Sequence, residues 1–201
     1  MNLAIQICKA SEAAELVTFK EKEGVPFHAV ISIEHPSDEG TPVEEGAAPR
    51  LDEIIGPQWG DRQLILKCWD APGPEFGVAM PDLQLVHDAI AHAKKWKPEE
   101  GDYRLLIHCN QGRSRSPAIA LLLMRYFRGV GTEQQCLDDL LLLRPQALPN
   151  STIVEHGDKA LGCGGKLIKV FQEAPSLAEG HKARLLALRR FVKEDAPPEL
   201  R

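Results

Sequence analysis

Residues 105–117 read LLIHCNQGRSRSP, and the rest of the sequence is best interpreted outward from this stretch. An apolar run of strand length leads directly into Cys109, and an almost wholly apolar segment over residues 117–127 follows. Gly112 lies between them, where a tight turn needs a positive φ angle or close backbone approach. A strand, a short loop and a helix in this order aim several backbone N–H groups and a helix N-terminus at one point. The stretch therefore predicts a binding site for an anion such as a phosphate group.

The side chains in this turn suit phosphoryl transfer. A helix N-terminus and a neighbouring guanidinium favour the thiolate form of a cysteine, so Cys109 is a candidate nucleophile. Arg115 offers a planar pair of N–H donors to two phosphoryl oxygens, which a lysine does not. Ser116 is placed to donate a hydrogen bond to the sulfur, and His108 to orient the loop. We therefore expect Cys109 to attack phosphorus and form a phosphocysteine intermediate.

The same segment resembles the signature of the protein tyrosine phosphatase superfamily, His-Cys, five residues, then Arg-Ser. It is most similar to the small dual-specificity branch, and within it to small predicted tyrosine phosphatases of bacteria. The resemblance implies that Cys109 is the nucleophile and Arg115 the phosphate clamp, and that neither a cofactor nor a metal is used. It also implies a substrate-binding set around them, namely His108, Asn110, Gln111, Gly112, Arg113 and Ser114.

The family also places a general acid on the loop that follows the strand upstream of the signature. Residues 64–69 form that strand here, so the resemblance implies that Asp70 protonates the leaving oxygen and later activates water. The order WDAP at residues 69–72 departs from the tryptophan–proline–aspartate order of the classical enzymes. Asp82 is therefore an alternative acid, although it lies at an expected helix start, where a carboxylate has an ordinary electrostatic role.

Along the chain, apolar runs of strand length alternate with helical patterns. The strands are expected at residues 3–8, 29–33, 64–69 and 105–108, and the helices at about 81–97, 117–127, 132–143, 152–161 and 176–192. Pro81 suits a first helical turn, while Thr132 with Gln135 and Ser176 with Glu179 form capping-box patterns. Two segments rich in proline and glycine are expected to be loops, a mobile one over residues 34–50 and another over residues 71–79.

This alternation predicts an α/β fold with a central, mainly parallel sheet flanked by helices on both faces. The length of 201 residues suits a single domain, which we divide into a phosphatase-like catalytic part over residues 1–165 and a C-terminal helical extension with a frayed tail over residues 166–201. The basic residues of the last helix, Lys182, Arg184, Arg189 and Arg190, indicate either a docked helix with a solvated side or a surface for a partner or an anionic membrane.

Composition excludes several other classes of protein. A net charge of −5 argues against a protein that binds duplex nucleic acid. No apolar run approaches the roughly 18 residues that span a bilayer, and the N-terminus lacks the pattern of a signal peptide, so a cytoplasmic protein without a transmembrane segment is expected. The five cysteines form no CxxC pair and the seven histidines no HxH or HxxxH pair, so neither a disulfide framework nor a metal site is expected.

Several residues have two interpretations. Cys68 could form a protective disulfide with Cys109, or belong to the core. Arg113 could be a solvated loop residue, or a second cation for highly charged substrates such as phosphoinositides or RNA 5′ ends. Arg144 and Asn150 lie in a stretch similar to the arginine-proline-asparagine segment that supports the phosphate loop in many small phosphatases, but they also read as a helix stop and an N-cap.

The sequence thus favours a protein tyrosine or dual-specificity phosphatase acting on a phosphorylated protein or a small phosphomonoester, with phosphate or sulfate bound in the loop. Three alternatives remain. They are a phosphate-recognition module with little turnover, a phosphatase of phosphoinositides or RNA 5′ phosphates, and a related cysteine-loop enzyme such as a sulfurtransferase or arsenate reductase.

Overall fold

A computed structural model of the whole chain describes residues 2–36, 47–70 and 80–194, with residues 188–194 described by their backbone. The expected loop over residues 71–79 and the expected tail after residue 194 lie outside this part. The strands are β1 (Leu3–Lys9), β2 (Ala29–Glu34), β3 (Gln63–Lys67) and β4 (Tyr103–Cys109). The helices are α1 (Ala10–Lys22), α2 (Leu51–Ile54), the short 3-10 helix η1 (Pro57–Trp59), α3 (Leu83–Lys95), α4 (Arg115–Arg128), α5 (Glu133–Leu143), α6 (Ser151–Ala160), α7 (Lys166–Glu173) and α8 (Pro175–Glu194).

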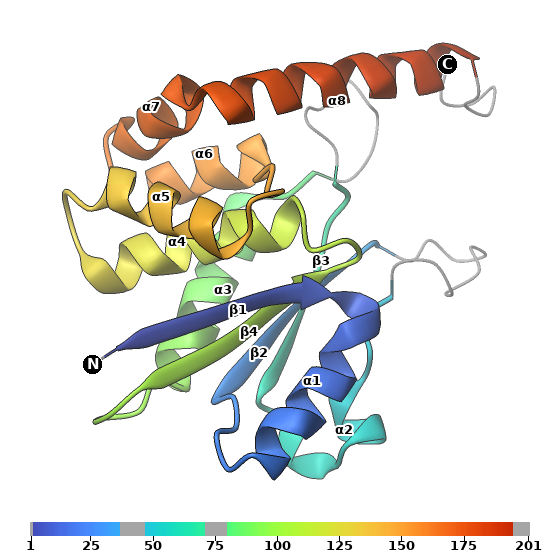
Figure 1. Cartoon of the computed structure of the whole chain (residues 1–201), viewed down its shortest axis with the longest axis vertical. Helices are drawn as coiled ribbons and strands as arrows, with labels where there is room; N and C mark the ends of the chain where they lie inside the picture. Colours follow the sequence, from blue (N-terminus) through green and yellow to red (C-terminus); the bar gives the residue numbers. More distant parts are fainter. Residues whose placement is uncertain (1, 37–46, 71–79, 195–201) are drawn as a thin grey trace.

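The four strands form one sheet in the order β1-β4-β2-β3, and every pairing is parallel (Figure 1). Strand β4 therefore has a neighbour on each side, and its last residue, Cys109, is in register with Lys9 of β1 and Ile33 of β2. Every residue of β2 is buried, and so is all of β4 except Arg104, as expected for strands covered on both faces. The predicted parallel sheet, with the signature at the carboxyl end of a central strand, is confirmed.

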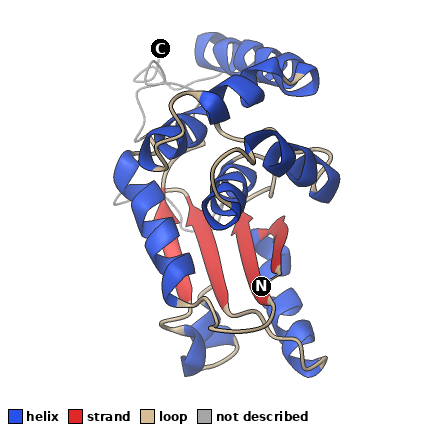
Figure 2. Cartoon of the chain, turned by 90° about the vertical axis from the view of Figure 1, so that its left-hand side faces the viewer, coloured by secondary structure: helices blue, strands red, loops and turns tan. Residues whose placement is uncertain are grey.

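Helices cover both faces of the sheet, as predicted. On one face, α1, α2 and η1 bury a small cluster that includes Val17, Leu51, Trp59 and Leu106. On the other face lies the larger core, centred on α4, whose residues 115–125 are all buried. Figure 2 shows the strands side by side, with their carboxyl ends directed toward the larger group of helices. The elements over the carboxyl end of β4 therefore come from this group.

The structure corrects several predicted helix starts. Helix α3 begins at Leu83 after the N-cap Asp82, so Pro81 precedes the first turn instead of forming it. The hydroxyl of Thr132 donates to the carbonyl of Gly129 and does not cap α5, and Ser176 lies inside α8, so both expected capping boxes are wrong. Helices α1, α2, η1 and α7 were not predicted. Few residues of α1 are buried, and the other three are short, with four, three and eight residues.

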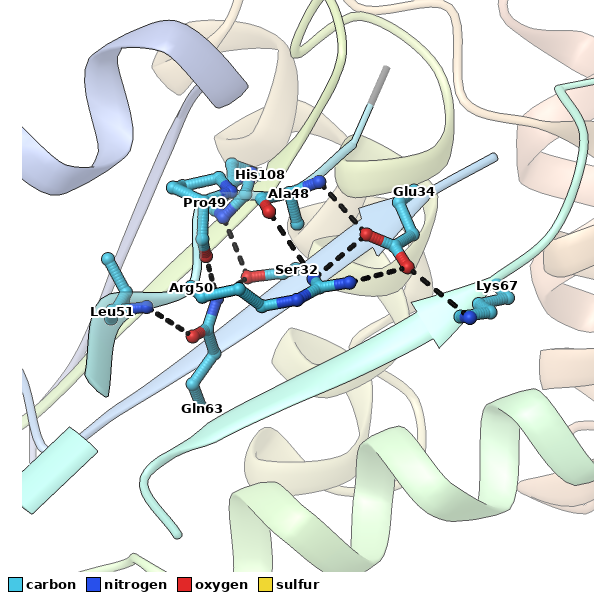
Figure 3. Close-up of polar contacts among 9 residues, drawn as sticks. All are labelled: Ser32, Glu34, Ala48, Pro49, Arg50, Leu51, Gln63, Lys67 and His108. Atoms are coloured by element: carbon cyan, nitrogen blue, oxygen red, sulfur yellow. Dashed lines mark hydrogen bonds and ion pairs between the residues drawn. The ribbon is translucent and has the colours of Figure 1, made fainter. Parts of the chain in front are cut away.

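The expected mobile loop over residues 34–50 is wrong at Glu34, whereas residues 47–50 belong to neither a helix nor a strand. Glu34 is the buried last residue of β2, and its carboxylate pairs with the guanidinium of Arg50 at 2.9 Å and with the Lys67 ammonium at 3.7 Å (Figure 3). The backbone N–H of Ala48 donates to the same carboxylate at 3.0 Å. Burial alone raises the pKa of Glu34, but these partners outweigh it and hold the pKa below its usual value. Residues 37–46, between these fixed ends, lie outside the described part.

Close packing of α6 on α4 depends on Gly157. A Cβ atom there would lie 2.0 Å from Cδ2 of Leu122, which is 1% exposed. Alanine is normally better than glycine inside a helix by about 1 kcal/mol. We expect Gly157→Ala instead to lower the free energy of unfolding by about 1–3 kcal/mol, measured by urea denaturation, because Leu122 has no room to move. In a Leu122→Ala background the same change should cost much less, and an equal cost in both backgrounds would contradict this account.

Candidate active site

The turn at residues 109–115 is here called the anion loop. Four of its backbone carbonyl groups point outward and are bonded by donors from other parts of the chain. Each of these carbonyls accepts a hydrogen bond from a donor beyond the loop: Asn110 from Ala10 N at 3.4 Å, Gly112 from Arg144 Nε at 3.1 Å, Arg113 from Leu148 N at 2.7 Å and Ser114 from Asn150 N at 3.2 Å. In a trans peptide unit the C=O of one residue and the N–H of the next point in opposite directions. The N–H groups that follow these carbonyls therefore face the inside of the loop, as an anion nest requires.

Gly112 is required at its position for two reasons. Its φ angle is +63°, a conformation that other residues rarely adopt. A Cβ atom there would lie 2.7 Å from the carbonyl oxygen of Cys8 and 3.0 Å from Nη2 of Arg144. The predicted role of this glycine in a tight turn is thus explained by both its backbone conformation and its close neighbours.

Cys109 ends β4 at the base of the loop and is 2% exposed. Its Sγ lies 3.2 Å from the hydroxyl oxygen of Ser116, which is fully buried in the first turn of α4. When the sulfur is ionised it has no proton to give, so the serine hydroxyl must then donate. This contact is the one that the sequence predicted between the two residues.

Arg115 is buried, yet the Nε of its guanidinium has no hydrogen-bond partner among the described residues. Its Nη1 donates to the carbonyl of Cys68 at 2.7 Å, and its Nη2 lies 3.4 Å from Nε2 of His35. The N–H groups of Nε and Nη2 lie parallel along one edge, the arrangement that binds two oxygens of a phosphate. A buried donor without a partner is costly, so this edge indicates a site for an anion.

His35 is a site residue that the sequence did not predict, because it lies in the segment taken for a mobile loop. Its ring packs on the indole of Trp69 with centroids 4.7 Å apart, and it faces the guanidinium of Arg115. Burial, and then the positive charge of Arg115, lower the pKa of His35. We expect a neutral imidazole there, since a second cation beside Arg115 is disfavoured. No spacing motif in the sequence marks this residue.

Asp70 touches the anion loop and is held by three partners. Its Oδ1 accepts hydrogen bonds from the Ser114 hydroxyl at 2.7 Å and from Nδ2 of Asn150 at 3.1 Å, and its Oδ2 pairs with Arg184 of α8 at 2.9 Å. Burial raises the pKa of this carboxyl, but Arg184, Arg115 and the Ser114 hydroxyl together lower it below its usual value. In this arrangement Asp70 is a carboxylate.

The other candidate acid, Asp82, has a structural role. Its exposed side chain accepts a hydrogen bond from the backbone N–H of Leu85 at 2.8 Å and so caps α3. Of the two aspartates, only Asp70 has a hydrogen bond to the anion loop among the described contacts. The assignment of the general acid to Asp70 remains a proposal, developed below.

For Arg144 and Asn150, both interpretations of the sequence hold. Asn150 caps α6 by accepting from the N–H of Ile153 at 3.1 Å, while its backbone N–H supports Ser114 and its side chain reaches Asp70. Arg144 terminates α5, and its side chain also donates to the carbonyl of Gly112. These two residues thus link the ends of two helices to the anion loop.

His108, directly before the nucleophile, lies at the end of a chain of hydrogen bonds through Ser32 and Gln63 (Figure 3). Nε2 of Gln63 donates to the carbonyl of Pro49 and to Oγ of Ser32, both at 2.7 Å. Nε2 of His108 lies 2.7 Å from the same Ser32 hydroxyl oxygen, while its Nδ1 is buried and has no hydrogen-bond partner among the described residues. Burial lowers the pKa of His108 to about 4, although Glu34 opposes this. The ring is therefore neutral and contacts Ser32 of β2, and its expected role in orienting the loop stays a prediction.

Cys68 and Arg113 also had two interpretations in the sequence. All five cysteines are free and buried, and burial raises the pKa of Cys68 to about 12, which disfavours its thiolate. A protective disulfide between Cys68 and Cys109 stays a prediction. Arg113 is exposed, and its Nε lies 3.4 Å from the carbonyl of Gln146, so its role as a second cation also stays a prediction.

The described residues lack two further features, a metal site and a membrane-spanning helix. They contain no group of three or more His, Cys, Asp or Glu side chains that could hold a metal ion. In the same part of the chain, no helix combines the length and apolar character needed to cross a bilayer.

The chain has the fold of the small dual-specificity phosphatases. The crystal structure of human DUSP28 matches it with a TM-score of 0.54 and 19% identity, over 79% of this chain and 91% of that one. A mouse putative dual specificity phosphatase complexed with zinc tungstate matches with a TM-score of 0.52 and 21% identity, over 84% and 86%. Tk-PTP in its active form matches with a TM-score of 0.50 and 17% identity, over 81% and 92%. The sequence matches no protein-family model and no curated protein.

The buried neutral His108 should make stability depend on pH in a defined window. Its pKa falls from 6.5 to about 4 on folding, so between these values the unfolded chain holds a proton that the folded chain does not. The free energy of unfolding must then decrease as the pH falls through this window. Between pH 6.5 and 4, the free energy of unfolding, measured by urea denaturation, should fall in both proteins. We expect the fall in His108→Gln to be about 2–3 kcal/mol smaller than the fall in wild type. The exposed His87, changed to Gln, should keep the wild-type slope, and the same slope in His108→Gln would contradict this assignment.

Proposed function

We propose that this protein is a cysteine-dependent phosphate-monoester hydrolase, and more specifically a protein tyrosine or dual-specificity phosphatase. The proposal is carried by one observation, the sulfur of Cys109 at the base of a loop whose carbonyls are bonded outward, together with the buried and unpartnered Nε of Arg115 at the end of the same loop. A phosphate bound there has donors for its oxygens and a nucleophile below its phosphorus. The fold shared with known dual-specificity phosphatases supports the proposal.

In the first step, the sulfur of Cys109 attacks phosphorus in line and the bond to the ester oxygen breaks. Asp70 in its protonated form transfers its proton to that leaving oxygen. The inward N–H groups and the Nε–Nη2 edge of Arg115 stabilise the charge on the equatorial oxygens as the transition state forms. The products of this step are the free alcohol or phenol and a phosphocysteine.

In the second step, Asp70, now ionised, accepts a proton from a water molecule that attacks the phosphocysteine. The bond between sulfur and phosphorus breaks, and inorganic phosphate and the cysteine thiolate are released. The hydroxyl of Ser116, 3.2 Å from the sulfur, donates to the departing thiolate and makes it a better leaving group. Asp70 is protonated again and ready for the next substrate.

The substrate is proposed to be a phosphorylated protein or a small phosphomonoester, with phosphate or sulfate as ligands of the same loop. The chemistry is proposed to be metal-independent, since Arg115 and the inward N–H groups supply the charge stabilisation that a metal ion provides elsewhere. A thiol nucleophile works only while it is reduced, which favours the cytoplasm as the place of action.

A second candidate, a phosphate-recognition module with little turnover, has an observation in its favour. Asp70 is tied to Arg184 and Ser114, and these contacts hold its pKa low, so a proton for the leaving oxygen is scarce at neutral pH. Such a protein would bind phosphate through the anion loop but hydrolyse esters slowly.

Turnover separates the two candidates. The wild-type protein should hydrolyse p-nitrophenyl phosphate, and Cys109→Ser should reduce kcat by at least about 10³ while phosphate binding, measured by calorimetry, persists. The matched control is Cys163→Ser, another buried cysteine outside the loop, which should retain wild-type turnover. Phosphate binding without any Cys109-dependent turnover would establish the recognition module. A panel of phosphotyrosyl and phosphoseryl peptides, phosphoinositides and 5′-phosphorylated RNA then identifies the substrate class.

The role of Asp70 is tested by leaving groups of different basicity. At a pH acidic enough for Asp70 to hold its proton, we expect Asp70→Asn to slow phenyl phosphate, whose phenolate is a poor leaving group, by about 10²–10⁴ in kcat/KM. For an activated aryl phosphate, whose phenolate leaves without protonation, the loss should stay below about tenfold. Asp82→Asn is the matched control and should affect both substrates alike. If Asp70→Asn slowed the two esters to the same extent, Asp70 would not be the acid.

A further inference from the structure

The C-terminal helix α8 reaches the active site from beyond residues 1–165. Its Arg184 donates from Nη1 to the Ser114 hydroxyl at 2.7 Å and from Nη2 to the backbone carbonyl of Asp70 at 2.5 Å. The same Nη2 forms the ion pair with the Asp70 carboxylate at 2.9 Å. One guanidinium thus joins α8 to the anion loop and to the proposed general acid.

Helix α8 packs closely against the rest of the protein, and this packing positions the Arg184 side chain. Leu177 is 1% exposed, and a Cβ atom at Gly180 would lie 2.3 Å from Cδ2 of Leu148, so the helix backbone approaches that segment closely. The ring of His181 packs edge-on against Phe171 of α7 with centroids 5.2 Å apart. These positions recur every three or four residues and share one helix face with Arg184. The contact with Asp70 therefore belongs to a packed face of α8.

We propose that Arg184 is a positioning residue that holds Asp70 as a carboxylate against Ser114 and thereby sets which phosphate esters this protein hydrolyses at neutral pH. The proposal rests on the proposed function, because it assigns to α8 a control over the acid of that reaction. The sequence had left this basic helix between simple docking and binding to a partner or membrane.

The charges around Asp70 single out Arg184. The cations facing the carboxylate are Arg184 from α8 and Arg115 from α4, and both favour its ionised form. Arg115 has its own task, because a bound phosphate dianion would engage its Nε and Nη2. The neighbouring His35 and His181 have lowered pKa values and are neutral near pH 7, while Cys68 has a raised pKa and carries no charge. Arg184 is thus the cation whose main effect falls on Asp70.

An ionised Asp70 affects the two steps in opposite ways. It cannot protonate the leaving oxygen, so esters with basic leaving groups react slowly, but it is ready to accept a proton from water in the second step. The protein should therefore prefer esters of acidic phenols or other good leaving groups at neutral pH. Removing Arg184 should move the protonation of Asp70 to higher pH and relax this preference.

The ionisation itself can be measured without turnover. In Cys109→Ser protein labelled with ¹³C at aspartate carboxyl groups, the Asp70 signal is identified by its loss in Asp70→Asn. We expect Arg184→Gln to raise its titration midpoint by about one pH unit. Arg184→Lys, which keeps the charge, should restore most of the difference. Lys182→Gln, an equal charge change at an exposed position of the same helix, should leave the midpoint in place. A midpoint unmoved by Arg184→Gln would overturn the proposal.

Kinetics give the second readout. On phenyl phosphate at pH 7, Arg184→Gln should raise kcat/KM about three- to tenfold. The alkaline limb of the pH profile should move to higher pH. For an activated aryl phosphate, kcat/KM should change little. A parallel loss on both esters with an unshifted limb would make Arg184 merely structural and overturn the proposal. Failure of the proposed function would show differently, as absence of any Cys109-dependent turnover, and the carboxyl titration would still decide whether Arg184 controls Asp70.

Discussion

The outward anchoring of the anion-loop carbonyls is the constraint on which the rest of the site depends. The donors that hold these carbonyls come from the start of α1, from the end of α5 and from the segment that leads into α6. If one carbonyl were released, its peptide unit could turn, and the N–H of the next residue would leave the anion. Three parts of the chain outside β4 and α4 thus contribute to the site by fixing the orientation of a few peptide units.

Much of this arrangement could be predicted from the sequence, because it depends on short, local patterns. The apolar run of β4, the glycine at position 112 and the apolar helix α4 are contiguous, so their order alone defines the loop, and all four strands are recognisable by their apolar runs. The contact between Cys109 and Ser116 follows from the same local geometry. Asp70 was singled out by the resemblance, which places an acid on the loop after β3, and the structure brings it to the anion loop through Ser114.

The contacts that could not be predicted are those made across the fold. His35 and Arg184 carry no motif, and they reach the site only because β2 ends beside β4 and α8 packs over the segment at Leu148. Glu34 was misassigned because its acidic, proline-rich neighbours resemble a solvated loop, whereas Arg50 and Lys67 pair with its carboxylate from elsewhere in the chain. Residue types that are common on surfaces give no sequence signal when tertiary contacts bury them.

The position of β1 at the edge of the sheet has a consequence for how the chain matures. Among the described strands it pairs with β4 alone, and the register joins Leu3 to Tyr103 and Lys9 to Cys109. While the protein is being made, the first strand must wait for about a hundred later residues before its backbone can be paired, and such distant pairings form slowly. Its exposed edge is meanwhile open to wrong partners. The nucleophile therefore reaches its working surroundings only when the earliest and the middle parts of the polypeptide have met.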